Sequence, residues 1–174
     1  NINYNFFPRP HFIIQGASII KDQLKITEIK ELHIDLSVDS LFSLKNIIIK
    51  DVILENSNFN LNKKNSNFFY KILDNNFLEN NFIIKNSNIF FQTNEKEVLF
   101  INKIINMKYY YDTKLLKNVL TSKNEIFNIP YSFYLFKDEK KKFVFSEIKF
   151  KFLNLRIESE LDYNNDEKKG ILNF

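Results

Sequence analysis

The chain has 174 residues, which is enough for one domain with a hydrophobic core. It contains no cysteine, so disulfides and thiol chemistry are excluded, and a net charge of +4 is only mildly basic. No apolar run approaches the ~20 residues that a membrane-spanning helix needs. The longest, around residues 12–20, is interrupted by Gln15, Gly16 and Ser18.

The N-terminal third predicts extended structure. Pro8 and Pro10 favour an extended entry into a strand over residues 11–20, where Gly16 indicates a bulge or a close approach of another backbone. Residues 25–38 follow as one long strand or a bent pair. Only two glycines and three prolines are available for turns, so we expect Asn to adopt left-handed backbone, as in residues 55–58.

Two similar stretches, residues 46–61 and 81–92, dominate the middle of the chain. Ile48-Ile49-Lys50-Asp51 aligns with Ile83-Ile84-Lys85-Asn86, 35 positions later (48 to 83). Both stretches are rich in Ile, Val and Phe, which predicts strands over 46–55, 59–61 and 82–93. Their apolar residues fall on both faces of the pleat, so the second face needs a cover.

Residues 66–78 form the best helix candidate, because Ser66 can cap a segment with Phe69, Ile72 and Leu73 on one side. Strands are predicted again over 98–111, where the length suits two strands, and over 126–136. Further strands are expected from residue 144 onward. The total is nine or ten strands joined mostly by short turns, which is typical of an antiparallel meander.

Few residues indicate chemistry. His11 and His33 lie in different predicted strands, with no Cys or paired-carboxylate spacing near either, so we expect no metal site. Glu158 and Glu160 share a strand face that is charged throughout, which indicates a solvated face rather than an acid–base pair. Acidic residues interrupt the basic and aromatic stretch 137–152, so nucleic acid is not expected either. We predict no enzyme activity, no catalytic residue and no cofactor.

The aromatic content favours two alternative functions. Twenty Phe and eight Tyr are a heavy load for strands that are apolar on both sides. One interpretation is a closed β-sandwich that acts through protein contacts or in outer-membrane assembly. The other is a curved sheet whose concave face is covered by lipid acyl chains, each buried methylene contributing ~0.8 kcal/mol.

The N-terminal pattern resembles that of a known family. Pro10-His11-Phe12 leads to Gly16-Ala17, then to residues 31–38, 41–44 and 47–54, and the order of residue classes is similar to the N-terminal region of the AsmA-like proteins of Gram-negative bacteria. Residues 86–104 are similar to the second recurrent strand pair of that family. The resemblance covers residues 8–110 and rests on spacing and residue class.

The resemblance implies a repeating β-groove related to the chorein-like bridge proteins, which carry phospholipid between membranes. It also implies an inner-membrane anchor before residue 1, a periplasmic body, envelope protein partners and no catalytic residue. Residues 1–174 would then be a single β-groove segment of a longer membrane-anchored protein.

We therefore predict a mostly β fold, an antiparallel meander curved into an open groove, with one short helix near residues 66–78. Phospholipid acyl chains are the expected ligand. The residues predicted to line the groove are Leu32, Ile34, Leu36, Ile48, Val52, Leu54, Leu99, Ile101, Phe133, Leu135, Ile148 and Phe150.

Overall fold

The computed structural model describes residues 1–21, 24–38, 47–67, 80–138, 143–162 and 167–173. These residues form eleven strands and a short 3-10 turn, η2 (Lys151–Leu153). The strands are β1 (Ile2–Asn5), β2 (His11–Lys21), β3 (Leu24–Leu36), β4 (Ile49–Leu61), β5 (Asn81–Gln92), β6 (Val98–Asp112), β7 (Lys117–Ile126), β8 (Ile129–Asp138), β9 (Phe143–Phe150), β10 (Leu155–Asp162) and β11 (Glu167–Asn173).

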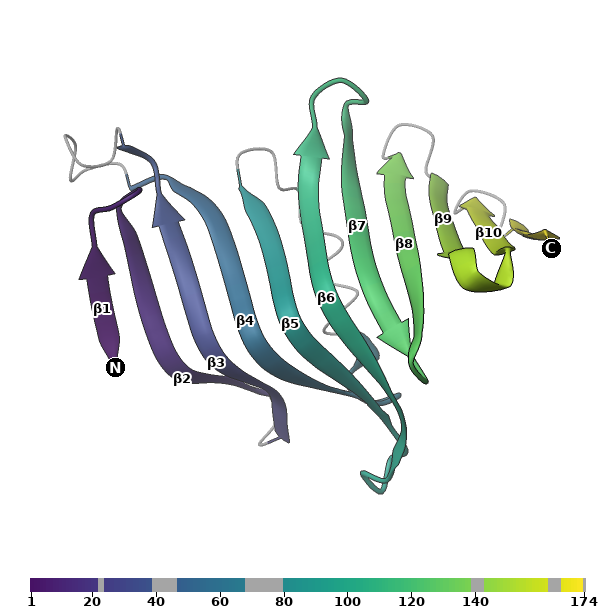
Figure 1. Cartoon of the computed structure of the whole chain (residues 1–174), viewed down its shortest axis with the longest axis horizontal. Helices are drawn as coiled ribbons and strands as arrows, with labels where there is room; N and C mark the ends of the chain where they lie inside the picture. The colour runs from purple at the N-terminus through teal and green to yellow at the C-terminus, as the bar shows by residue number, and fades with distance from the viewer. Residues whose placement is uncertain (22–23, 39–46, 68–79, 139–142, 163–166, 174) are drawn as a thin grey trace.

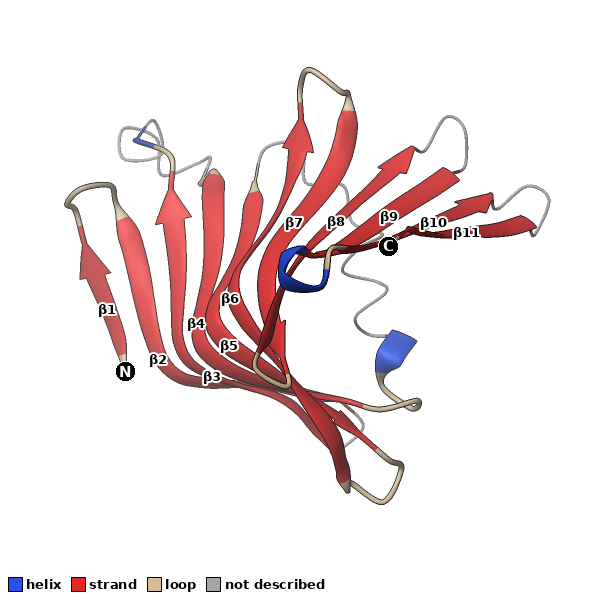
Figure 2. Ribbon diagram, turned by 45° about the vertical axis from the view of Figure 1, so that its right-hand side comes forward, coloured by secondary structure: helices blue, strands red, loops and turns tan. Residues whose placement is uncertain are grey.

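All eleven strands belong to one sheet, and their order in the sheet follows their order in the chain. The sheet is strongly curved and open, with β1 and β11 at opposite edges (Figures 1 and 2). The predicted mostly β fold with an open curved sheet is confirmed. The described strands do not form the two packed sheets of the alternative β-sandwich.

One pairing departs from the predicted antiparallel order, because β4 and β5 run parallel. Parallel neighbours need a crossover connection, and residues 62–80 supply it here. The predicted helix 66–78 falls in this connection. Ser66 and Asn67 are helical, and the rest of the predicted range lies outside the described residues.

The two similar stretches of the sequence are neighbours in the sheet, in a different alignment from the predicted one. Leu54 pairs with Ile84 and Asn58 with Asn88, a constant offset of 30 rather than 35. The shared pattern is therefore Asn56-Ser57-Asn58 with Asn86-Ser87-Asn88. The parallel pairing sets these identical triplets side by side.

At one level of β2 to β6, a row of residues interrupts the alternation of side chains between the two faces, and the sheet is creased there. Gly16, Lys30, Asn56, Asn86 and Ile105 each lie between paired residues of their strands, at the same level. Gly16, Asn56 and Asn86 adopt positive φ angles of 72°, 52° and 47°. Nothing lies within 4 Å of a Cβ built on Gly16, so the glycine is needed for its backbone angle and not for close packing.

The crease changes which alternate residues share a face. Leu54 and Phe59 are five positions apart in β4, yet both belong to the same buried cluster with Ile29, Ile84 and Ile104. Members of this cluster come from both sides of the crease, so the sheet folds toward the face that carries them. This buried cluster therefore lies on the concave face of the sheet.

Several predicted strand boundaries were wrong. Residues 55–58 were expected in a turn, but they lie inside the continuous strand β4, where Asn56 provides the left-handed backbone of a bulge. Residues 98–111 form part of one long strand, β6, instead of two. Neither β1 nor β7 was predicted, and residues 151–153, within the range where further strands were expected, form the 3-10 turn η2.

Candidate functional site

The strand register defines a continuous apolar face on the concave side of the sheet. Directly paired residues lie on the same face, so a row of partners can be followed across neighbouring strands. One row contains Phe12, Ile34, Val52, Phe82, Tyr109, Leu120 and Leu135, and the next contains Ile14, Leu32, Leu54, Ile84, Met107, Ser122, Phe133, Ile148 and Ile157. We call these two rows the apolar face; neither contains a charged residue.

Burial along the apolar face is uneven. Leu54 and Ile84 are fully buried at the crease. Away from it, most members stay half-buried, including Phe12, Ile34 and Ile148. Because all described strands lie in one sheet, no second described sheet covers these side chains. The half-buried members leave apolar surface available to a ligand.

Several polar groups on the apolar side have hydrogen-bond partners. At the crease, the Ser57 N–H donates to Ser87 Oγ at 2.9 Å, and the Ser87 hydroxyl donates to the Lys85 carbonyl at 2.7 Å. Farther along the sheet, the Tyr131 hydroxyl donates to Asn102 Oδ1 at 2.8 Å. Burial raises the pKa of Tyr131, which keeps this phenol neutral.

Nine of the twelve predicted lining residues follow the apolar face or its direct continuation along the strands. They are Leu32, Ile34, Leu36, Val52, Leu54, Phe133, Leu135, Ile148 and Phe150. Ile48 precedes β4 and is half-buried, and its carbonyl accepts a hydrogen bond from the Ser37 N–H at 2.9 Å.

The grouping of Leu99 and Ile101 with the other lining residues is wrong. Ile101 pairs with Phe90, which alternates with the inward-facing Phe91, so Ile101 lies on the opposite face. Leu99 is unpaired at a register shift between β5 and β6, and Leu99 and Ile101 are 63% and 45% exposed. The extra residue Ile105 exchanges the two faces of β6, which simple alternation along the sequence does not anticipate.

Sequence reasoning also missed part of the apolar face. Phe82, Ile84, Met107, Tyr109 and Leu120 were not predicted as lining residues, yet strand pairing places them between predicted ones. A signal was present in the repeated Asn-Ser-Asn triplet. Aligning it at 30 positions would have matched Val52 with Phe82 and Leu54 with Ile84.

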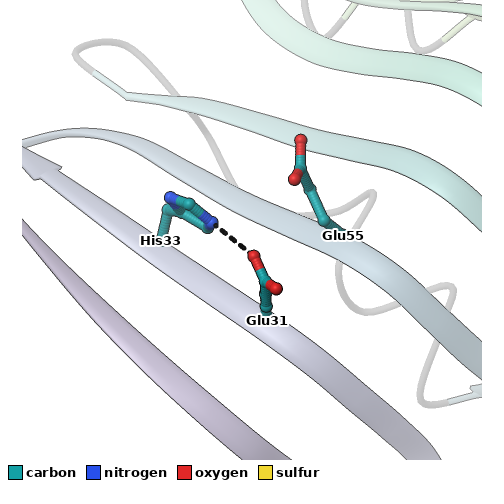
Figure 3. A group of neighbouring side chains, drawn as sticks. All are labelled: Glu31, His33 and Glu55. Carbon is teal, nitrogen blue, oxygen red and sulfur yellow. Dashed lines mark hydrogen bonds and ion pairs between the residues drawn. The ribbon is translucent and has the colours of Figure 1, made fainter. Parts of the chain in front are cut away.

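The opposite face of β2 to β5 carries isoleucines such as Ile13 and Ile53 beside charged residues, and it includes a group of possible metal ligands. Glu31, His33 and Glu55 each offer one ligand atom, and these atoms lie within 4.8 Å of one another. Figure 3 shows Glu31 and His33 on one strand and Glu55 on its neighbour. His33 Nε2 lies 3.4 Å from Glu31 Oε2. The prediction that no paired carboxylates lie near the histidines is therefore wrong for His33.

Strand pairing explains this grouping. Glu31 and His33 are two positions apart in β3 and share a face, while Glu55 is the direct partner of Glu31 in β4. The Lys85 ammonium lies 3.2 Å from Glu55. The His11 ring stacks on His33 with ring centroids 6.3 Å apart. The set can hold a proton or a cation between two strands.

No protein-family model matches the chain, and a comparison with curated protein sequences found no significant match. Among the described residues, no helix is long and apolar enough to cross a membrane.

Proposed function

We propose that this chain binds phospholipid acyl chains along the apolar face and takes part in lipid transport between the membranes of a Gram-negative envelope. The observation that carries the proposal is the apolar face itself: two adjacent rows without a charge, half-buried over much of their length, on the concave side of an open sheet.

Acyl chains suit this face better than a polar ligand. The two rows offer mainly aliphatic and aromatic side chains, and Ser122 is their one serine. A buried methylene contributes ~0.8 kcal/mol, so removing a sixteen-carbon chain from water is worth roughly 12 kcal/mol. Half-buried Ile, Leu and Phe side chains gain from the same contact, because their remaining exposed area is covered.

The length of the sheet suits one segment of a longer lipid-carrying groove. Eleven strands spaced ~4.8 Å apart extend roughly 48 Å along the stacking direction. The resemblance to the AsmA-like family points the same way, since it implies a groove assembled from repeated segments. In this proposal the protein is held at the inner membrane by a part outside residues 1–174, and the groove works in the periplasm.

The proposal is tested by native mass spectrometry of the purified chain, followed by organic extraction. Phospholipid that remains bound through size-exclusion chromatography, at a fixed number of molecules per chain, supports it. A chain that is free of lipid and also fails to take up phospholipid from vesicles contradicts it. A co-purifying protein in place of lipid favours the alternative, an assembly module that acts through protein contacts.

A further inference from the structure

We propose that Glu31, His33 and Glu55 form a binding site for a divalent transition-metal ion on the face of the sheet opposite the apolar face. The inference is independent of the lipid proposal, because this face lies opposite the apolar one. Glu31 and Glu55 are direct cross-strand partners, so two negative charges lie opposite each other. Like charges at such positions destabilise a sheet unless a cation lies between them.

A second carboxylate pair in the same protein shows how such repulsion is relieved internally. Glu147 and Glu158 are also direct cross-strand partners, in β9 and β10. There the Arg156 guanidinium contacts both carboxylates, and the Lys149 ammonium lies 2.7 Å from Glu147. That pair is neutralised by the chain itself.

The pair of Glu31 and Glu55 lacks an equivalent bridge among the described contacts. Lys85 reaches Glu55 only, and the neighbour of Glu31 is the His33 imidazole. The other charged groups facing this side of β3 and β4 include Asp35 and Asp51, which are again direct partners, with Arg9 3.7 Å from Asp51. A cation between Glu31 and Glu55 would offset the repulsion within this pair.

The donor types select the kind of ion. One imidazole nitrogen and two carboxylate oxygens suit Zn²⁺ and neighbouring transition metals, whereas Mg²⁺ and Ca²⁺ prefer oxygen alone. Two donor atoms that each lie ~2.1 Å from one ion are at most about 4.2 Å apart. The ligand atoms of Glu31, His33 and Glu55 now lie within 4.8 Å of one another, so the most distant pair must approach by roughly 0.6 Å. Rotation of the glutamate side chains, which are about a quarter to a third exposed, provides this movement.

Strand backbone fixes the arrangement. Glu31 and His33 alternate on one strand, and Glu55 is held opposite by the β3–β4 pairing. The set supplies three protein ligands, which leaves a coordination position for water. His11 is not among the three ligands. Its Nδ1 lies 2.7 Å from the Arg9 carbonyl, and its ring stacks on His33, which helps to hold the imidazole in place.

Isothermal titration of the tag-free, chelator-treated protein with Zn²⁺ tests the site, with Mg²⁺ titrated in parallel. We expect one Zn²⁺ per chain and no saturable Mg²⁺ binding at the same concentrations. Glu31→Gln, Glu55→Gln and His33→Gln should each weaken Zn²⁺ binding at least tenfold. Glu158→Gln, in the carboxylate pair that Arg156 bridges, is the matched control and should bind Zn²⁺ like the unmodified protein.

Circular dichroism establishes that each variant keeps its fold, and the three glutamine variants provide independent readouts if one of them unfolds. The site is wrong if the unmodified protein shows no saturable 1:1 binding of Zn²⁺. It is also wrong if folded Glu31→Gln and Glu55→Gln variants retain full affinity, or if the loss occurs only in His11→Ala. None of these three results bears on lipid binding, which is measured separately.

Discussion

Asn56 and Asn86 lie side by side in the parallel strands β4 and β5, and both hold left-handed backbone, with φ angles of 52° and 47°. They stand 30 positions apart and begin the same triplet, Asn-Ser-Asn. Each interrupts the alternation of side chains between the two faces of its strand at the crease. This pairing brings Leu54 and Phe59 of a single strand onto the same face, and thereby builds the buried cluster.

Replacing Asn56 by Val should destabilise the protein. A β-branched residue in left-handed backbone costs about 1–2 kcal/mol, whereas Asn56→Gly should change stability little or raise it. Urea denaturation measures the difference. Lys103→Val, at an exposed β6 position without positive φ, is the control and should lose no stability. Equal effects of Val at positions 56 and 103 would show that the crease does not depend on this backbone conformation.

The buried serines of the two triplets should respond unequally to removal of their hydroxyls. Ser87→Ala removes the acceptor of the Ser57 N–H, which is fully buried, so a cost of about 1–3 kcal/mol is expected. Ser57→Ala removes only a 3.3 Å hydrogen bond to the Glu55 carbonyl and should cost less. Chemical denaturation of the two variants compares them directly. A larger loss for Ser57→Ala would contradict the observed direction of this network.

Much of the fold follows from the sequence, for a physical reason. Alternation of apolar and polar residues in β3 directly reflects which face is buried, so Leu32 and Ile34 were assigned to the same side as in the structure. Alternation fails where a strand gains a residue. Ile105 leaves no sequence signal comparable to Gly16, so the face beyond it was misassigned, most clearly at Ile101.

The grouping of Glu31, His33 and Glu55 was harder to predict from the sequence than the apolar face. Glu31 and His33 are close in sequence and could have been recognised as neighbours on one strand face. Glu55 reaches them only through the β3–β4 register, which pairs it directly with Glu31. Pairing over such distances is a tertiary property, because each strand alone is compatible with several registers.

Stability should fall on acidification, partly through Glu147. Burial raises the pKa of Glu147, but hydrogen bonds and charges from Lys149 and Arg156 outweigh it, so the folded-state pKa lies below the ordinary value of 4.5. The unfolded chain therefore binds more protons between the two pKa values, and the free energy of unfolding rises with pH there. This contribution is complete above the unfolded pKa and is lost as the pH falls through the folded one.

Glu147→Gln should flatten that dependence below about pH 5, as measured by urea denaturation at a series of pH values. Glu95→Gln, in the exposed turn before β6, provides the comparison and should leave the slope unchanged. An unchanged slope for Glu147→Gln would mean that the contacts with Lys149 and Arg156 do not favour the ionised carboxylate in solution.

Two aspartates placed on opposite faces of the sheet test directly whether the apolar face binds lipid. Ile148→Asp puts a charge on the half-buried apolar face, away from the buried cluster, and Ile101→Asp puts the same charge on the exposed opposite face. Val52→Asp is less decisive because Val52 packs against the cluster. Uptake of fluorescent phospholipid from vesicles is measured for folded protein of each kind. Lipid binding by the apolar face predicts that Ile148→Asp loses uptake at least tenfold while Ile101→Asp keeps it. Equal uptake by both variants would contradict the claim.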